Sequence, residues 1–563
     1  MSDTIYDVFL SFSGDDRKFG RDLAEQLRSE GMDVFLDEDG ITLTDSLTER
    51  IGLAVQGSKT LVAYYSEGYA SRHACQHELM TAFLAAQREG TVRQRILVIN
   101  PEPGTDHIHP IELADAKFAH PQAGVTDLAR WIAGRARELN GPFGRPPSFE
   151  ERLWPVWLAR HVRGFVGRHR ELWTLHTELH ASKYSVIRER AYGSFVSLWG
   201  TPGSGKTALV ANYAWRFRDA FPGGVRWLSL AGAGSRPDRL QSVYCGELRS
   251  SCRELGMDLS SVPDEQLSSA VARTLDKTEN ATLWIVDDLP PGCGPEHLGH
   301  LVLPGGCGAH TVLVGQDDAF RGHLPVVRVG RLSSIEADEL LDSYRKPDDD
   351  VDKKSRRCLV QDLGGNPGAL IAVGEYLRHR QGITSYLTAR DELSTKQSLR
   401  DTVFENSRRV IDPMSVDELV LLDFISRADQ HEFPSPVLAA VQSFATVDVG
   451  AVLSRLLSRS VATRDGTRWR LDPLVVEAAK ERLRTLDVKT IPQSEITDFR
   501  VEVAKVLNPS NGSRKRGWGN NSRGQSTSTS RSRHFRASAL LSPWSRLFTL
   551  YDTVNFPGRP RQK

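Results

Sequence analysis

The residues best able to do chemistry lie in one glycine-rich stretch, Gly200-Thr201-Pro202-Gly203-Ser204-Gly205-Lys206-Thr207. Its spacing, Gly-x-x-x-x-Gly-Lys-Thr, is typical of a loop that binds the phosphates of a nucleotide. Glycines let successive backbone N–H groups point at phosphate oxygens, Lys206 supplies charge and Thr207 offers a hydroxyl to Mg²⁺. A ligand-free glycine turn is the alternative, but a strand-like run before the loop and a helical pattern after it favour phosphate binding. The nucleotide-binding residues predicted in this loop are Gly200, Pro202, Gly203, Ser204, Gly205, Lys206 and Thr207.

Two adjacent acids, Asp287 and Asp288, follow the apolar run Leu283-Trp284-Ile285-Val286. An apolar strand that ends in carboxylates is the Walker B arrangement, which places a carboxylate near Mg²⁺ and its water. The plainer alternative is an acid pair on the surface. Given the phosphate loop, the sequence favours a Mg²⁺ site made by Thr207, Asp287 and Asp288.

The first ~140 residues alternate apolar runs with amphipathic segments, as expected for an α/β domain with a parallel sheet. Strands are predicted at 6–12, 33–36, 59–65 and 95–100. Between them, apolar residues recur at helical spacing, for example Cys75, Leu79 and Phe83. In a doubly wound sheet the ligand site lies beyond the carboxyl ends of the strands, so the loops starting near Ser11, Asp37 and Ser66 are its expected walls.

Three blocks in this region resemble a known family, the Toll/interleukin-1 receptor (TIR) domain. Residues 6–17 (YDVFLSFSGDDR) resemble its first box, and residues 35–41 (FLDEDGI) resemble the entry to its BB loop. Residues 64–79 (YYSEGYASRHACQHEL) resemble the segment that carries the catalytic glutamate of NAD-cleaving TIR domains. The resemblance implies a flavodoxin-like TIR domain over residues 1–140.

By that resemblance, Glu78 is the carboxylate that assists cleavage between nicotinamide and ribose. Nicotinamide leaves as a neutral molecule, so the group that needs help is the oxocarbenium-like ribose, which a carboxylate stabilises. Outside this motif a lone Glu would be read as a solvated helix residue. Ala74 departs from the Trp that many members have, and Ser13 from the Arg frequent in plant members. The residues that the resemblance implies for NAD⁺ binding are Ser11, Ser13, Gly14, Asp15, Phe35 and Cys75.

Residues 141–148 (GPFGRPPS) break any helix and predict a linker over 141–160. Beyond it, residues 163–172 (RGFVGRHREL) resemble the motif that precedes the phosphate loop in STAND ATPases and touches adenine there, which implies nucleotide contacts for Val166 and Arg168. A P-loop α/β NTPase domain of the NB-ARC type is thus expected over 161–330. Its sensor strand, 310–317 (HTVLVGQD), lacks the usual Arg, which favours a slow ADP/ATP switch over rapid ATP turnover.

Residues 331–400 match the helical lid of the same family, whose Gly-x-Pro block would bring Pro367 to the nucleotide. A mostly helical stretch with a hairpin around Asp465-Gly466 resembles a winged-helix subdomain over 401–490. Asp472 replaces a His that senses ADP in the family. From 509 to 563 a basic, largely disordered tail is expected, with seven Lys or Arg and no acid between Arg514 and Arg536. A truncated or frame-shifted chain and a natural short form whose tail meets a polyanion both stay open.

Composition sets limits on function. The 563 residues carry a net charge of +1, so no global electrostatic attraction to nucleic acid or to an anionic membrane is expected apart from the tail. No signal peptide or membrane span is apparent, and the six scattered cysteines suit reduced thiols, which together predict a cytoplasmic protein.

Two functions are compatible with these patterns. In the first, ATP or ADP with Mg²⁺ gates self-association of a STAND protein, and the assembled TIR domains cleave NAD⁺ as substrate, as in antiphage or immune defence. In the alternative, the TIR domain only binds other TIR domains within an ATPase switch. The trigger, the subunit number and a linear or cyclic ADP-ribose product stay open.

Overall fold

The structure, a computed structural model, describes residues 6–36, 47–114, 119, 124–144, 164–180, 194–233, 239–254, 257–277, 280–290, 292–303, 308–379, 385–395 and, with further gaps, 403–486. The predicted BB loop, most of the linker and the basic tail lie outside these residues. The chain divides into two compact units, Met1–Lys353 with Gly365–Tyr386 and Lys354–Gly364 with Leu387–Lys563. The predicted lid, residues 331–400, contributes to both. The predicted domain boundaries stay predictions.

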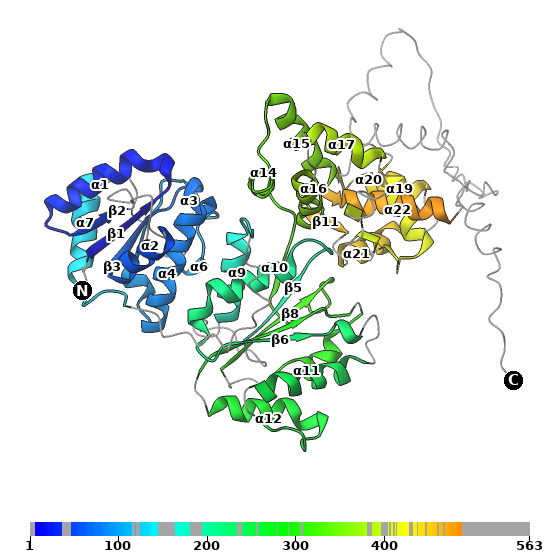
Figure 1. The fold of residues 1–563 in the computed structure, drawn as a ribbon, viewed down its shortest axis with the longest axis horizontal. Coiled ribbons are helices and arrows are strands. Elements are labelled where there is room, and N and C mark those ends of the chain that lie inside the picture. The colour runs from blue at the N-terminus through cyan, green and yellow to red at the C-terminus, as the bar shows by residue number, and fades with distance from the viewer. Residues whose placement is uncertain are drawn as a thin grey trace, which may run out of the picture. The chain divides into compact units, whose positions relative to one another are not determined.

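The N-terminal domain of the first unit is built on a four-stranded parallel sheet in the order β2-β1-β3-β4 (Figure 1). These strands are buried on both faces, so they read as nearly continuous apolar runs. Their bounds are β1 Tyr6–Phe12, β2 Val34–Leu36, β3 Ser58–Tyr64 and β4 Ile96–Ile99.

Helices cover both faces of this sheet. One face packs on α1 (Arg17–Ser29) and α7 (Val125–Arg137), the other on α2 (Leu47–Gln56) and α4 (His73–Glu89). The strands alternate accordingly, since Val8 and Leu10 face the first pair while Phe9 faces the second. The short helices are α3 Glu67–Ser71, α5 Val92–Arg95 and α6 Ile111–Ala114.

The central domain of the first unit has a five-stranded parallel sheet in the order β6-β7-β8-β5-β9. The strand that leads into the glycine-rich stretch, β5, lies between β8 and β9. The two sheets confirm the α/β fold class. The strand bounds are β5 Ser194–Trp199, β6 Val225–Ser229, β7 Thr282–Asp287, β8 Ala309–Gly315 and β9 Val326–Arg328.

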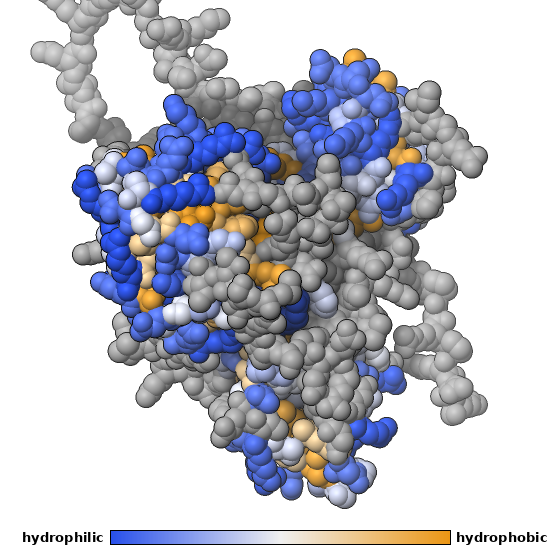
Figure 2. Space-filling view, turned by 60° about the vertical axis from the view of Figure 1, so that its left-hand side comes forward, coloured by the Kyte–Doolittle hydropathy of each residue, from blue (hydrophilic) through white to orange (hydrophobic). Residues whose placement is uncertain are grey.

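Helices α9 (His169–His180) and α10 (Lys206–Arg216) pack on one face of the central sheet, and α11 (Leu240–Glu254) and α12 (Asp264–Asp276) pack on the other. The remaining helices of this region are α13 Leu298–Leu301, α14 Ser334–Asp342, α15 Asp350–Asp362, which crosses into the second unit, and α16 Pro367–His379. Hydrophilic residues make up most of the coloured surface in Figure 2, with smaller hydrophobic areas among them. Among the described helices, none combines the length and hydropathy that a membrane crossing requires.

The second unit contains a small antiparallel sheet in the order β10-β12-β11. Asp465 pairs with Arg468, so the predicted hairpin spans two residues that lie outside the described part. Asp472 caps the next helix, because its Oδ1 accepts from the backbone N–H groups of Leu474 at 2.9 Å and Val475 at 3.2 Å. The elements are α17 Tyr386–Thr395, α19 Val416–Ser426, β10 Glu432–Pro434, α20 Val437–Phe444, α21 Val449–Ser458, β11 Ala462–Asp465, β12 Arg468–Leu471 and α22 Pro473–Thr485.

Candidate functional sites

The phosphate loop runs from the end of β5 to the start of α10. Gly203 and Gly205 have φ angles of +77° and +89°, in the left-handed region that glycine adopts without strain. A Cβ on Gly200 would lie 2.4 Å from the carbonyl oxygen of Val329, so this position has no room for a side chain. The loop is thus shaped by the glycines that the motif predicts.

Lys206 folds back over this loop. Its Nζ donates to the carbonyl oxygens of Gly200 at 2.8 Å and Thr201 at 3.1 Å. Burial lowers the pKa of Lys206 to about 8, and the nearby Asp287 and Asp288 oppose that effect. A phosphate in the loop would give this desolvated ammonium an anionic partner in place of neutral carbonyls.

Two of the predicted metal ligands, Thr207 and Asp287, are hydrogen-bonded to each other. Thr207 Oγ1 donates to Asp287 Oδ2 at 3.0 Å, and the backbone N–H of Asp288 donates to Asp287 Oδ1 at 2.8 Å. Burial raises the pKa of Asp287 to about 6, with the charge of Asp288 adding to the rise. Asp288 itself has a φ of +60° and accepts a hydrogen bond from Ser229 at 3.2 Å.

This donor set suits Mg²⁺. A Mg²⁺ ion takes one or two protein oxygens and completes its shell with water and phosphate oxygens. The hydroxyl of Ser204, which is buried and lacks a hydrogen-bond partner, further suits a loop built around a ligand.

The Gly-x-Pro block closes over the loop from the lid side. The backbone N–H of Gly368 donates to Gly203 O at 2.9 Å, and Asn366 Nδ2 donates to Pro202 O at 3.3 Å. A Cβ built on Gly205 would have the Pro367 ring as its nearest neighbour, at 3.9 Å. The structure therefore brings Pro367 to the phosphate loop.

Arg168 binds backbone carbonyl groups close to the phosphate loop. This buried residue has a φ of +59°, and its guanidinium donates to the carbonyl oxygens of Gly330 at 2.7 Å, Arg331 at 3.2 Å and Ser204 at 3.3 Å. It also pairs with Glu171 at 2.7 Å. The side chain thus clamps the start of α9 to the phosphate loop, whereas Val166 two residues earlier stays partly exposed. A ligand contact by either residue stays a prediction.

The second candidate site lies at the carboxyl ends of β1 and β3. Ser11 Oγ donates to Glu78 Oε2 at 2.5 Å and lies 2.9 Å from the hydroxyl of Tyr69. Since the single proton of Ser11 goes to Glu78, Tyr69 is the donor in the second bond, and its proton is shared with the carbonyl oxygen of Cys75 at 3.3 Å. Glu78 is only 4% exposed, which sets its carboxylate in a closed polar network rather than on a solvated helix face.

The other residues implied for NAD⁺ binding differ in their surroundings. The Ser13 hydroxyl is buried without a hydrogen-bond partner, and Cys75 Sγ donates to Phe12 O at 3.4 Å. Gly14 and Asp15 are exposed, and Asp15 pairs with Arg72 at 3.4 Å. Phe35 stacks on Phe9 with ring centroids 5.1 Å apart, so it supports the core of the domain. The structure thus brings Ser11 and Glu78 together, with Cys75 linked to them through Tyr69.

Sequence reasoning missed Tyr69. Burial raises its pKa well above the ordinary value, with Cys75 and the Glu78 charge acting in the same direction, so it remains a neutral phenol that donates to Ser11. The sequence offered one indication of its role: Tyr69 lies within residues 64–79, the block that resembles the catalytic segment of TIR domains. The Tyr69 hydroxyl bonds Ser11, which lies 58 positions earlier in the chain. A local sequence pattern cannot indicate a contact between residues so far apart.

Comparisons with known proteins support these two domains to different degrees. A family model described as a TIR domain matches residues 8–128. The regulatory protein AfsR of Streptomyces coelicolor is 28% identical over 370 residues, which cover 62% of this chain and 35% of AfsR. The chain thus spans about a third of the length of that curated relative.

Two solved structures of ATPases are similar to the chain. The Walker-type ATPase PABY2304 of Pyrococcus abyssi is 14% identical with a TM-score of 0.39, covering 56% of this chain and 95% of that one. The Signal Transduction ATPase with Numerous Domains (STAND) protein PH0952 of Pyrococcus horikoshii, which has a tetratricopeptide repeat sensor, is 17% identical with a TM-score of 0.29, covering 65% and 48%. At these TM-scores the account of the central domain depends on its own strand order and loop geometry.

Proposed function

Residues 8–128 are a TIR domain, and from that premise we propose that this protein is a nucleotide-gated signalling ATPase whose TIR domain hydrolyses NAD⁺ at the nicotinamide–ribose bond. The observation that carries the proposal is the buried Glu78 carboxylate, which accepts a hydrogen bond from Ser11 at the carboxyl edge of the sheet. A buried carboxylate oriented by a specific donor at a strand-end site is a typical active-site feature.

The chemistry requires little of the protein. The C–N bond breaks with its electron pair leaving on nicotinamide, which departs neutral, and water adds to the ribose carbon with loss of one proton, yielding ADP-ribose. The Glu78 carboxylate stabilises the positive charge that develops on the ribose. Ser11 orients that carboxylate, and Tyr69 in turn orients Ser11, so both are positioning residues.

The central domain supports the gating part of the proposal. Glycines shape the phosphate loop, Lys206 is desolvated over it, and Thr207 with Asp287 provides oxygens for Mg²⁺. Bound Mg²⁺ would neutralise phosphate charge there. The strand that ends at Gly315 is followed by Gln316 and Asp317 where an arginine would contact a terminal phosphate, which favours a retained nucleotide with slow turnover. Assembly in antiphage or immune defence is part of the same proposal.

One observation favours the alternative of a non-catalytic TIR interaction module. Glu78 is 4% exposed and its Oε2 already accepts from Ser11, so the site is closed in this state. A catalytic domain must open this network, whereas an interaction module can keep it as a structural core.

The substitution Glu78→Gln separates the two functions. It keeps the shape of the side chain and removes the charge that stabilises the ribose cation, so NAD⁺ consumption by the full chain should fall by roughly 100-fold or more, while assembly by light scattering stays unchanged. Glu25→Gln, an exposed position on α1, is the matched control and should retain full activity. Unchanged NAD⁺ consumption in Glu78→Gln, or none in the unmodified chain at any concentration, would leave only the interaction module.

A further inference from the structure

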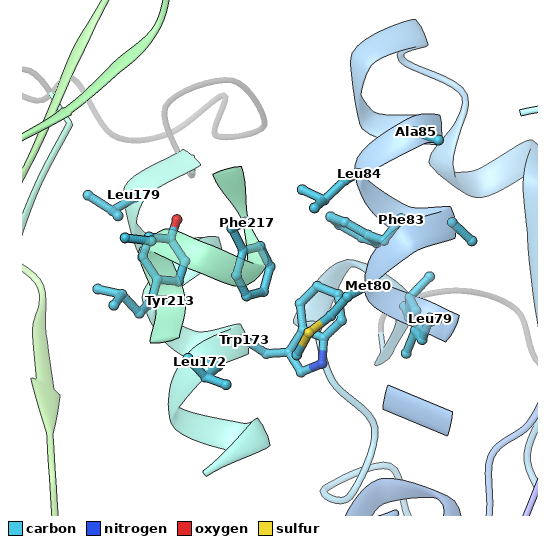
Figure 3. Close-up of a cluster of buried hydrophobic side chains, with 14 of the residues drawn as sticks. Leu79, Met80, Phe83, Leu84, Ala85, Leu172, Trp173, Leu179, Tyr213 and Phe217 are labelled. Atoms are coloured by element: carbon cyan, nitrogen blue, oxygen red, sulfur yellow. The ribbon is translucent and has the colours of Figure 1, made fainter. Parts of the chain in front are cut away.

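Helix α4, which carries Glu78, is apolar on more than the side that faces its own sheet. Met80, Phe83 and Leu84 are all buried, along with most of the helix. A helix that is apolar on more than one face requires burial on more than one face. Figure 3 shows Met80, Phe83 and Leu84 pointing toward Trp173 and Phe217 of the central domain. We call this side of the helix the outer face of α4.

The contacts across this outer face are those of a packed core. Trp173 of α9 is 0% exposed, and its ring meets Phe83 edge-on with centroids 5.1 Å apart. The same ring contacts Phe217, directly after α10, at 5.3 Å. The TIR helix and the two central helices therefore share one buried cluster.

Within the described part of the chain, four side-chain hydrogen bonds make the contact specific, since each donor needs an acceptor at the right distance and angle. Each joins a side chain of the TIR domain to one of α9 or α10. They are Trp173 Nε1 to Gln76 Oε1 at 2.8 Å, His176 Nε2 to Gln87 Oε1 at 3.0 Å, Thr177 Oγ1 to Glu112 Oε2 at 3.1 Å and Arg216 to His73 Nε2 at 3.0 Å.

One of these bonds leads to Glu78. Gln76, which accepts from Trp173, donates through Nε2 to the hydroxyl of Tyr65 at 3.3 Å and to the carbonyl of Tyr69 at 3.2 Å. Tyr69 then bonds Ser11, which bonds Glu78. The central domain thus contacts a residue that positions the carboxylate network.

The first residues of α9 and α10 lie at the phosphate loop. Helix α10 begins with Lys206, and α9 begins directly after Arg168, whose guanidinium holds the carbonyl oxygen of Ser204. Both helices that hold the TIR domain are consequently anchored where the phosphates are expected. A shift of either helix changes the surface offered to α4.

We propose that the outer face of α4 is a docking surface on which α9 and α10 hold the TIR domain in a resting state with Glu78 closed. The inference rests on the proposed function and names its regulation. Release of α4 frees Gln76 from Trp173, which loosens Tyr69 and Ser11 around Glu78. It also exposes an apolar helix face to a second copy of the chain.

The substitution Thr177→Glu tests the proposal in the full chain. It sets a new carboxylate against Glu112, whose pKa burial already raises, so it should weaken the docking without touching Glu78 or the phosphate loop. Adding Glu112→Lys to this variant replaces the repulsion by an ion pair and should restore the docking. Ser269→Glu, on the exposed side of α12, controls for the added charge.

Two readouts are needed. Amide deuterium uptake of residues 73–89 reports docking, and NAD⁺ consumption reports activity. We expect Thr177→Glu to raise both, with NAD⁺ consumption rising roughly 5- to 150-fold, the usual range of coupling between sites. The double variant should return both to the level of the unmodified chain, which also shows that the fold is intact.

Any other combination of the two readouts identifies which part of the proposal is wrong. Unchanged uptake of residues 73–89 in Thr177→Glu overturns the docking surface. Increased uptake without increased NAD⁺ consumption, in a chain whose activity depends on Glu78, overturns the resting-state role. Increased uptake in a chain that never consumes NAD⁺ supports the docking and rejects the proposed enzyme instead.

Discussion

At the scale of single residues, Lys206 at the phosphate loop and Asp287 at the end of β7 are groups of opposite charge whose pKa values lie closer together than usual. Burial lowers the pKa of Lys206 to about 8 and raises that of Asp287 to about 6. Each group would gain from an added counter-charge, Lys206 from a phosphate and Asp287 from a divalent cation. The loop is therefore electrostatically prepared for a metal–nucleotide pair.

The raised pKa of Asp287 predicts a pH-dependent Mg²⁺ affinity. Mg²⁺ binds the deprotonated carboxylate, which becomes the minor form as the pH falls through about 6. The contribution of Mg²⁺ to ADP affinity should thus decline between pH 7 and pH 5, by up to about tenfold per pH unit below 6. Calorimetric titrations with ADP at each pH, with and without Mg²⁺, measure this contribution.

Asp287→Asn is the control for protonation of the nucleotide itself. This variant should bind Mg²⁺ more weakly at neutral pH and show a flatter pH profile, because no carboxylate remains to titrate. A Mg²⁺ contribution in the unmodified chain that stays constant from pH 7 to pH 5 would refute the role of Asp287.

At the scale of elements, the end of β5 and the chain after β9 approach each other closely at the phosphate loop. The backbone N–H of Val329 donates to Trp199 O at 2.8 Å, and the next residue after Trp199 is Gly200, which contacts Val329 O. The glycine is required by this packing as well as by a ligand.

Gly200→Ala should therefore destabilise the central domain even without nucleotide. The added methyl would lie 2.4 Å from a backbone oxygen, and the resulting shift should cost roughly 1–3 kcal/mol. Thermal unfolding should show a midpoint lower by about 2–4 °C per kcal/mol. Gly330→Ala, where a Cβ meets no atom within 4 Å, is the matched control. Equal midpoints for the two variants would show that the approach is not tight.

The seam between α4 and α9 is rich in neutral imidazoles beside a cation. Burial lowers the pKa of His77 to about 4 and that of His169 to about 3, with His73 and Arg216 lowering both further. Arg218 adds to the effect at His77. His73 accepts from Arg216, which requires its neutral form, and its pKa is also lowered.

Acid should consequently loosen this seam. The unfolded chain takes up protons near the ordinary histidine pKa of about 6.5 while the folded chain resists until about 4 at His77, so the free energy of unfolding decreases as the pH falls through this window. Deuterium uptake of residues 73–89 should rise between pH 6.5 and pH 4.5, after correction for intrinsic exchange. His77→Gln should reduce the effect. Uptake that is independent of pH would contradict it.

At the scale of the whole molecule, a chain whose TIR domain is docked has a closed Glu78 site. Association that exchanges the docked face of α4 for another copy then couples activity to concentration. We expect NAD⁺ consumption per molecule to rise steeply over a hundredfold range of protein concentration. Specific activity that stays flat across that range would indicate a self-sufficient site.

The sequence alone determined the local parts of this protein. The spacing of Gly200, Gly205 and Lys206 predicted a phosphate loop, and alternation of apolar runs predicted parallel sheets, with β1 found at the predicted Tyr6–Phe12. The match to a TIR domain over residues 8–128 confirms the resemblance of the N-terminal boxes. Such features follow from backbone conformation and burial, which act over a few neighbouring residues.

Only the tertiary structure decided which distant side chains form hydrogen bonds with each other. Trp173 meets Gln76 across 97 positions, and Tyr69 meets Ser11 across 58. The guanidinium of Arg168 reaches the carbonyl oxygen of Gly330, 162 positions away, and the Glu78 carboxylate is buried in the fold. A hydrogen bond between distant segments depends on the packing of whole elements, and it leaves no periodic trace in the sequence around either partner.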